Sequence, residues 1–359
     1  MSVVRCPLSV VRYPLSVVRY PLSVVRCYFT LMTNSKIQNP KSKIQNLKSV
    51  VILGAGAWGT ALAKLAAING NQVHLWSRQG SQSLVSLLEN AHIVLSAISM
   101  QGVRDVASVV QSSPVSPETI FVTATKGLET KTTYTPSQIW QEIFPNHPVV
   151  VLSGPNLSQE IVRELPAATV VASKNINAAQ SVQLVFSSSR FRVYTNPDPV
   201  GVELGGTLKN VIAIAAGVCD GLNLGTNAKA ALVTRGLTEI VRIGKNLGAK
   251  TETFYGLSGL GDLLATCNSP LSRNYQLGYQ LAHGKTLKEI LAGLPGIAEG
   301  VNTCRVLMEI AQQRSIAIPI SEQVYQLLEG EVTPQQALDQ LMLRDIKPEF
   351  DDFSTEQMW

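Results

Sequence analysis

The feature that most constrains this 359-residue chain is a short apolar run followed at once by three spaced glycines. Residues 50–53 (VVIL) are mostly β-branched, which is typical of a buried parallel strand. Gly54, Gly56 and Gly59 come next in the spacing G-x-G-x-x-G, and residues 60–68 are strong helix formers. A strand, a glycine turn and a helix in this order predict the first βα unit of a nucleotide-binding sheet.

Each glycine of this turn has a physical reason to be glycine. Gly54 allows the tight turn, Gly56 lets a pyrophosphate approach the backbone, and Gly59 lets the helix pack closely on the sheet. The free N–H groups and the positive end of the helix then hold the phosphates. We therefore expect a dinucleotide cofactor here, with a second strand of the unit at residues 72–76.

The residues after that second strand bear on the choice of cofactor. NAD enzymes usually carry an acid there, which binds the ribose 2′-hydroxyl. This chain has Ser77-Arg78, and a guanidinium matches a 2′-phosphate that an acid would repel. We predict that NADP(H) is preferred and NAD(H) usable; the alternative is that Arg78 is a solvated surface residue.

Three more apolar runs, separated by helical stretches, predict further strands at residues 92–98, 119–124 and 148–153. This alternation predicts a doubly wound parallel sheet, whose ligands lie at the carboxyl ends of its strands. Polar clusters stand at these ends, at residues 96–99, 125–127 and 153–156. Cofactor and substrate are expected to meet there.

The pattern changes after residue 196, and helical periodicity dominates from there to about Asp345. Residues 201–222 are predicted to form one long helix, with one face that carries small residues and the ammonium of Lys209. Small residues let a ligand or another backbone come close, so Lys209 is a candidate catalytic group. The alternative is a surface lysine whose stem covers apolar neighbours.

Two later turns add candidate residues. Asp262 lies in the glycine-punctuated stretch 256–266, where it either joins a site or caps the helix that follows. Ser272 is predicted to cap the next helix and Arg273 to lie in its first turn, where a cation opposes the helix dipole. A cation beside free N–H groups suits a bound phosphate; pairing with a nearby acid is the alternative.

The first 48 residues differ from the rest. They repeat two heptads, S-V-V-R-C/Y-P-L and S-K-I-Q-N-P/L-K, and they contain eight basic and no acidic residues. The remainder has 22 basic and 25 acidic residues, so the net charge of +5 gives no reason to expect nucleic-acid binding. Prolines in the repeats oppose a coiled coil. We expect a disordered leader or translated repeat DNA, with a transit peptide as the alternative.

Residue spacing also argues against several classes of protein. No uninterrupted apolar run reaches the ~18–20 residues of a membrane span, and none is expected. Five cysteines without C-x-x-C spacing and four scattered histidines predict no disulfide framework and no metal site. Buried reduced thiols and the lack of an apolar signal core favour a cytoplasmic location.

We therefore divide the chain into four parts, and the predicted fold class is an α/β Rossmann-type doubly wound sheet followed by an all-α C-terminal domain. The parts are a disordered repetitive leader at 1–47, a dinucleotide-binding Rossmann domain at 48–195, an all-α substrate-binding domain at 196–345 and a C-terminal tail at 346–359.

Several motifs together resemble one family, the bacterial NAD(P)-dependent glycerol-3-phosphate dehydrogenases. They are GAGAWGTALA at 54–63, HLWSR at 74–78, TKGLE at 125–129, LSGPNLSQEI at 152–161, VELGGTLKNVIAIAAGVCDGL at 202–222, GLSGLGDLLATC at 256–267, SRNYQLG at 272–278 and EGVNT at 299–303. The joint occurrence of LKN, GLGDL and SRN is far more specific than the glycine fingerprint. The resemblance implies reversible reduction of dihydroxyacetone phosphate to sn-glycerol 3-phosphate, a glycerophospholipid precursor.

The resemblance also implies roles for single residues, and Lys209 matches the family's proton donor and acceptor. The positions that match substrate contacts are Lys126, Gly154, Asn156, Lys209, Asp262, Ser272, Arg273 and Asn274. The positions assigned to the cofactor are Gly54, Gly56, Trp58, Gly59, Arg78, Lys126, Ser158, Arg273, Ile297 and Glu299.

The chemistry agrees with the implied role of Lys209. Hydride transfer to a ketone carbon creates alkoxide character on oxygen, which a nearby ammonium stabilises and protonates. In the oxidative direction the amine must start neutral. We therefore expect burial and the charge of Lys126 to lower the pKa of Lys209.

One segment departs from the family pattern: only 13 residues separate Arg78 from the strand at His92, where the family usually carries a longer segment over the adenine. Two other functions are weighed. A related dehydrogenase of 2-keto or 3-hydroxy acids has no use for a phosphate cluster at residues 272–274. A cofactor-binding regulator without turnover has no use for Lys126, Lys209 and Asp262 together. A homodimer is compatible with each of these functions.

Overall fold

The computed structural model describes residues 47–294, 296, 298–346, 348 and 349. The leader expected at 1–47 lies outside the described residues, apart from Leu47, and so does most of the tail expected at 346–359. Ile297, a cofactor position implied by the resemblance, lies outside them too. The described residues from Leu47 onward form one compact unit.

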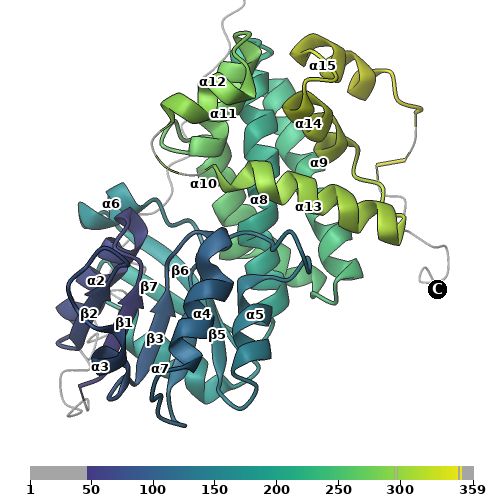
Figure 1. The fold of residues 1–359 in the computed structure, drawn as a ribbon. Helices are drawn as coiled ribbons and strands as arrows, with labels where there is room; N and C mark the ends of the chain where they lie inside the picture. Colours follow the sequence, from purple (N-terminus) through teal and green to yellow (C-terminus); the bar gives the residue numbers. More distant parts are fainter. Residues whose placement is uncertain (1–46, 295, 297, 347, 350–359) are drawn as a thin grey trace, which may run out of the picture. The chain divides into compact units, whose positions relative to one another are not determined.

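Seven strands form one sheet in the order β2-β1-β3-β4-β5-β6-β7 (Figure 1). Their bounds are β1 Ser49–Leu53, β2 Gln72–Trp76, β3 Ile93–Ser96, β4 Ile120–Thr123, β5 Val149–Ser153, β6 Ala167–Ala172 and β7 Phe191–Asn196. The five strands predicted from the sequence are β1 to β5, and they run parallel. The sheet continues beyond the prediction: β6 pairs with β5 in the antiparallel direction, and β7 is parallel to β6.

Helices cover both faces of the sheet, which confirms the doubly wound Rossmann-type fold. One face packs on α2 (Ala57–Ile68), α6 (Ser158–Val162) and α7 (Ile176–Phe186). The other packs on α3 (Leu84–Leu88), the short 3₁₀ turn Met100–Gly102, α4 (Val103–Gln111) and α5 (Pro136–Ile143). Because both faces are covered, β1 and β3 to β5 are almost wholly buried, as expected for apolar parallel strands.

The C-terminal part is helical, as predicted, and is organised around α8 (Pro199–Gly221). Asp198 caps this helix by accepting from Gly201 N, and Pro199 begins it. The other elements are α9 (Gly225–Asn246), a 3₁₀ turn at Thr251–Tyr255, a π turn at Leu257–Gly261, α10 (Asp262–Cys267), α11 (Arg273–Ala282), α12 (Leu287–Gly293), α13 (Glu299–Arg314), α14 (Pro319–Glu329) and α15 (Pro334–Met342).

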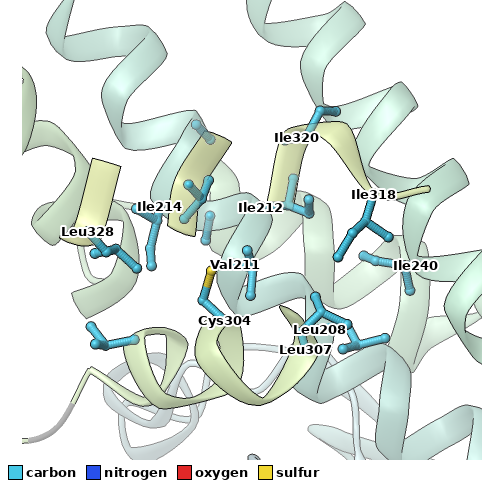
Figure 2. Close-up of a cluster of buried hydrophobic side chains, with 14 of the residues drawn as sticks. Leu208, Val211, Ile212, Ile214, Ile240, Cys304, Leu307, Ile318, Ile320 and Leu328 are labelled. Carbon is cyan, nitrogen blue, oxygen red and sulfur yellow. The ribbon is translucent and has the colours of Figure 1, made fainter. Parts of the chain in front are cut away.

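Side chains from α8, α9, α13 and α14 meet in one apolar core (Figure 2). Val211 and Ile212 of α8, with Cys304 of α13, are wholly buried in it. By length and hydropathy α8 could cross a membrane, although the sequence predicts no span. However, 94% of that stretch is buried within the fold, so α8 is packed as a core helix.

The small residues of α8 serve two kinds of contact. A side chain at Gly217 would clash with the main chain of Tyr275 on α11, so glycine at this position lets the backbones of α8 and α11 touch. Further towards the N-terminus, a Cβ at Gly205 would come within 2.8 Å of Ser258 O, and one at Gly206 would clash with Ser153 of β5. Gly205 and Gly206 therefore allow α8, which carries Lys209, to lie close to the carboxyl edge of the sheet.

Candidate active site

The glycine turn between β1 and α2 has the geometry that phosphate binding requires. Gly54 has φ +115°, and a Cβ there would come within 2.6 Å of Ala97 O; a Cβ at Gly59 would clash with Gly54 O. By contrast, a Cβ at Gly56 would have no neighbour within 4 Å. Gly56 is also the N-cap of α2, without a side-chain cap and without an acid in the first turn, so the helix N–H groups face open space.

The other predicted cofactor positions lie on loops and helix ends near the carboxyl edge. Arg78 follows β2 by two residues, is exposed, and makes no hydrogen bond or ion pair with any described residue. Trp58 and Ser158 are half-buried, in the first turns of α2 and α6. Glu299 begins α13 and accepts a hydrogen bond from Met100 N at 3.3 Å, which ties the loop after β3 to the helical part.

Three predicted residues from distant parts of the chain meet in one buried cluster. Asp262 lies between two lysines: its Oδ2 is 2.6 Å from Lys126 Nζ and its Oδ1 is 2.6 Å from Lys209 Nζ. The side chains of Asp262 and Lys209 are 3% and 7% exposed, and that of Lys126 is 23% exposed. Lys126 Nζ also lies 3.4 Å from Gly154 O, which brings a fourth predicted residue into the cluster.

The cluster changes the chemistry of Lys209. Burial disfavours the ammonium and lowers the pKa of Lys209, Asp262 raises it, and the charge of Lys126 lowers it; together these effects bring the pKa to about 8. This is the direction expected from the sequence. An amine with a pKa near neutrality can give up or take a proton during turnover, which a lysine of ordinary pKa does poorly.

Two threonines that the sequence analysis missed hold this cluster. Thr266 Oγ1 is hydrogen-bonded to Lys209 Nζ, and it follows Asp262 by four residues, so both lie on one face of α10. Thr207 accepts from Gly127 N at 3.2 Å and so ties the loop after β4 to α8. The spacing of four could have identified Thr266; the Thr207 contact is between distant segments and has no sequence signal.

The cluster predicted to bind phosphate is at the start of α11. Ser272 caps that helix by accepting from Tyr275 N, as predicted. Arg273 is exposed and makes no ion pair within 4 Å among the described residues. Its positive charge opposes the burial that raises the pKa of Glu299. Asn274 is buried, and its Oδ1 accepts from Gly300 N, so it fixes α11 against α13.

Asn156 and Gly154 form the corner after β5. Gly154 has φ +155° and packs against Thr169 of β6. Asn156 Nδ2 donates to Thr169 Oγ1 at 3.1 Å, while its Oδ1 has no partner among the described residues. This buried oxygen is therefore left without a hydrogen bond in the described structure.

A groove of about 690 Å³ lies elsewhere in the described structure. It lies between α8, α9, α14 and α15 and is mostly apolar, with none of the predicted site residues in its lining. We place the active site at the charged cluster, because the chemistry requires ionisable groups at the edge of the sheet.

Comparisons with protein families agree with this geometry. A family model for the NAD-dependent glycerol-3-phosphate dehydrogenase C-terminus matches residues 198–339. The corresponding N-terminus model matches residues 49–83 and 80–179, two stretches that meet just after Arg78, where the chain departs from the family pattern. Together the two models cover most of the described chain.

Individual relatives carry the same name. A glycerol-3-phosphate dehydrogenase (NAD(P)+) from Trichormus variabilis is 76% identical over 302 residues, which span 84% of this chain and 98% of the relative. One from Synechocystis sp. is 57% identical, spanning 85% of this chain and 96% of that relative.

Solved structures agree in fold. The crystal structure of glycerol-3-phosphate dehydrogenase from Coxiella burnetii has a TM-score of 0.80 and 34% identity, and covers 83% of this chain and 99% of its own. The enzyme from Saccharomyces cerevisiae, at 24% identity and a TM-score of 0.72, covers 82% and 99% and shares the fold. Taken with the family matches, these similarities show that the chain belongs to the NAD-dependent glycerol-3-phosphate dehydrogenase family and is an NAD(P)-dependent oxidoreductase.

Proposed function

We propose that this chain reduces dihydroxyacetone phosphate to sn-glycerol 3-phosphate, reversibly, with Lys209 as proton donor and acceptor. The observation that carries the proposal is the buried amine of Lys209, held by Asp262 beside Lys126 at the edge of a dinucleotide-binding sheet. A buried cation is rare unless it is paired or used. Here it is both paired and held at a lowered pKa.

The residues at the glycine turn fit a nicotinamide dinucleotide. Open space over Gly56 and the uncapped start of α2 accommodate a pyrophosphate, and such a cofactor supplies the hydride when bound. We assign Arg78 and the shortened segment after it to the adenine side; Arg78 has no competing partner among the described residues. We propose NADPH as the preferred cofactor, because a free guanidinium pairs with a 2′-phosphate.

In reduction, Lys209 Nζ starts as an ammonium and donates a proton to the oxygen of the ketone as charge develops there. Asp262 and Thr266 hold Nζ in place through their hydrogen bonds. In oxidation the neutral amine removes the proton from the substrate hydroxyl. The lowered pKa makes this neutral form accessible near pH 8.

The substrate phosphate is assigned to the start of α11. Its first-turn N–H groups and the exposed Arg273 provide positive charge, and Ser272 and Asn274 provide polar side chains beside it. Arg273 has no carboxylate within ion-pair distance among the described residues, so its charge is available for a dianion.

Two further properties belong to the same proposal. The described cysteines, Cys219, Cys267 and Cys304, are buried free thiols, which supports a cytoplasmic location.

We propose that the chain assembles as a homodimer, because two-fold dimers are the commonest homo-oligomers. Sedimentation equilibrium measures the mass of the assembly and so tests this.

The direct test is NADPH oxidation with purified protein and dihydroxyacetone phosphate, repeated with unphosphorylated dihydroxyacetone and with NADH. We expect turnover with the phosphorylated ketone, a large loss of kcat/KM without the phosphate, and slower turnover with NADH. Equal rates with both ketones would remove the phosphate assignment and favour a keto-acid type of dehydrogenase. Failure to oxidise NADPH or NADH with any ketone would refute the proposal.

A further inference from the structure

Ser153, the last residue of β5, has a hydroxyl group that no described residue binds. Its side chain is buried, with 2% exposure of the residue, and Oγ has no hydrogen-bond partner among the described residues. The main chain of Ser153 is satisfied, since its carbonyl oxygen accepts from Thr169 Oγ1 at 2.9 Å. The hydroxyl group is therefore the part of Ser153 that lacks a hydrogen-bond partner among the described residues.

The surroundings show where this hydroxyl points. A Cβ added to Gly206 would clash with Ser153 Oγ and would lie 3.4 Å from Lys126 Cε. Ser153 Oγ therefore lies against α8, beside the stem of Lys126, with no side chain at Gly206 in between. Lys209 is three residues further along α8, on the same face as Gly206. The hydroxyl is thus next to the charged cluster of Lys126, Asp262 and Lys209.

Two other buried serines, Ser96 at the end of β3 and Ser173 just after β6, are satisfied, whereas Thr123 Oγ1 at the end of β4 also lacks a partner among the described residues. Ser96 Oγ lies 3.2 Å from Thr125 Oγ1, and Ser173 Oγ donates to Val149 O at 2.7 Å, at the opposite end of β5. A buried hydroxyl without a partner destabilises the fold, and alanine would fill nearly the same space without that penalty. A serine with a free hydroxyl at the ligand edge of the sheet is therefore explained by a ligand.

Dihydroxyacetone phosphate has three polar groups, and the proposed function, on which this inference rests, provides for two. The phosphate is assigned to Arg273 and the start of α11, and the ketone oxygen to Lys209. The third group is a free primary hydroxyl, which is neutral and both donates and accepts. We propose that Ser153 Oγ hydrogen-bonds this hydroxyl and so selects a hydroxymethyl ketone over a methyl ketone. Ser153 is then a specificity-determining residue.

The test compares two substrates that differ only in that hydroxyl: dihydroxyacetone phosphate and hydroxyacetone phosphate, in which a methyl group replaces the hydroxymethyl group. For Ser153→Ala we expect kcat/KM for dihydroxyacetone phosphate to fall about tenfold, the loss of one neutral hydrogen bond. With the methyl ketone it should stay within about twofold of the wild-type value, within the scatter of such comparisons. The melting temperature should stay the same or rise.

Ser173→Ala is the matched control, because it removes a buried hydroxyl from the other end of the same strand pair. It should lower the melting temperature and leave the ratio of kcat/KM for the two ketones unchanged. An equal loss with both ketones in Ser153→Ala, or no loss with either, would overturn the assignment. A wild-type chain that reduces neither ketone would instead refute the proposed function, so the two failures are distinguishable.

Discussion

The two ends of the active site are built in different ways. The cofactor end is made of main chain and open space: Gly56 has nothing above it, and Arg78 is exposed and without a partner in the described structure. The reaction end is made of buried side chains whose charges are already paired, with Asp262 between Lys126 and Lys209. Backbone N–H groups are sufficient to bind the phosphates of a dinucleotide. Proton transfer instead needs a single amine that is held in a fixed position and has a suitable pKa.

The two ends of the site also differ in how far apart in the sequence their residues lie. The glycine turn, its strand and its helix occupy about twenty consecutive residues. In contrast, Lys126 and Asp262 are 136 residues apart, and Lys209 and Asp262 are 53 apart. The cofactor end can tolerate local changes, because its donors are backbone groups. The reaction end should fail when any one charge is removed, because the remaining partners are then buried without compensation.

The largest effect should come from Lys209→Ala. The proton donor is lost, so we expect kcat to fall by about 10²–10⁴-fold. The dissociation constant for NADPH should stay near the wild-type value, because the glycine turn is untouched. Steady-state kinetics and fluorescence titration of NADPH measure the two quantities. A near-normal kcat would show that the amine has no role in proton transfer.

Asp262→Asn should have the next largest effect. The substitution keeps the shape but removes the charge that holds both lysines, and we expect kcat/KM to fall by roughly 10–10²-fold. Because Asp262 raises the pKa of Lys209 against burial and Lys126, its removal should move the pH midpoint of reduction to lower pH. Thr266→Val is the companion variant: it removes a hydrogen bond to Lys209 without changing charge, so its midpoint should move less.

Two glycine variants separate folding from cofactor binding at the other end. Gly59→Ala should lower the free energy of unfolding by about 1–3 kcal/mol, because the new methyl group meets Gly54 O. Gly56→Ala has room in the fold and should unfold normally, yet it should weaken NADPH binding by about tenfold, because a methyl group stands where the pyrophosphate approaches. Denaturant unfolding with NADPH titration distinguishes them; equal behaviour would contradict the assignment of Gly56.

Arg78→Ala should have the narrowest effect, because it should change the binding of only one of the two cofactors. Loss of an exposed, charge-assisted pair with the 2′-phosphate should weaken NADPH binding by about tenfold and leave NADH binding within about twofold. The measurement is the dissociation constant of each cofactor, with Arg163→Ala, another exposed arginine of the same domain, as control. Equal effects on both cofactors would mean that Arg78 does not contact the 2′-phosphate.

These differences explain what the sequence could predict. Strands β1 to β5 and helix α2 follow from local patterns, so their positions were predicted within a few residues. Strand β7 was missed although Phe191 and Val193 are buried and Arg192 is exposed, an alternation typical of a strand. The antiparallel direction of β6 has no local signal, because it depends on how the chain crosses the sheet.

The candidate site shows the same limit. Lys209 was singled out from its helix face, but its partners followed only from the resemblance, because spacing cannot show which distant side chains meet. Thr266 was missed for this reason, because it acts through its contact with Lys209. Ser153 was predicted only as part of the polar cluster at residues 153–156, because the sequence cannot show that its hydroxyl is buried without a partner.

The most direct test of the central claim is the pH dependence of kcat/KM in both directions on the wild-type enzyme, because kcat/KM reports the pKa values of the free enzyme. With the pKa of Lys209 lowered to about 8, the reduction needs the ammonium and should be constant below about pH 8 and fall above it. The oxidation needs the neutral amine and should rise up to about pH 8 and then level off. Two opposite limbs with a shared midpoint are the predicted result; profiles that are flat from pH 6 to about 10, or that bend in the same direction, would contradict it.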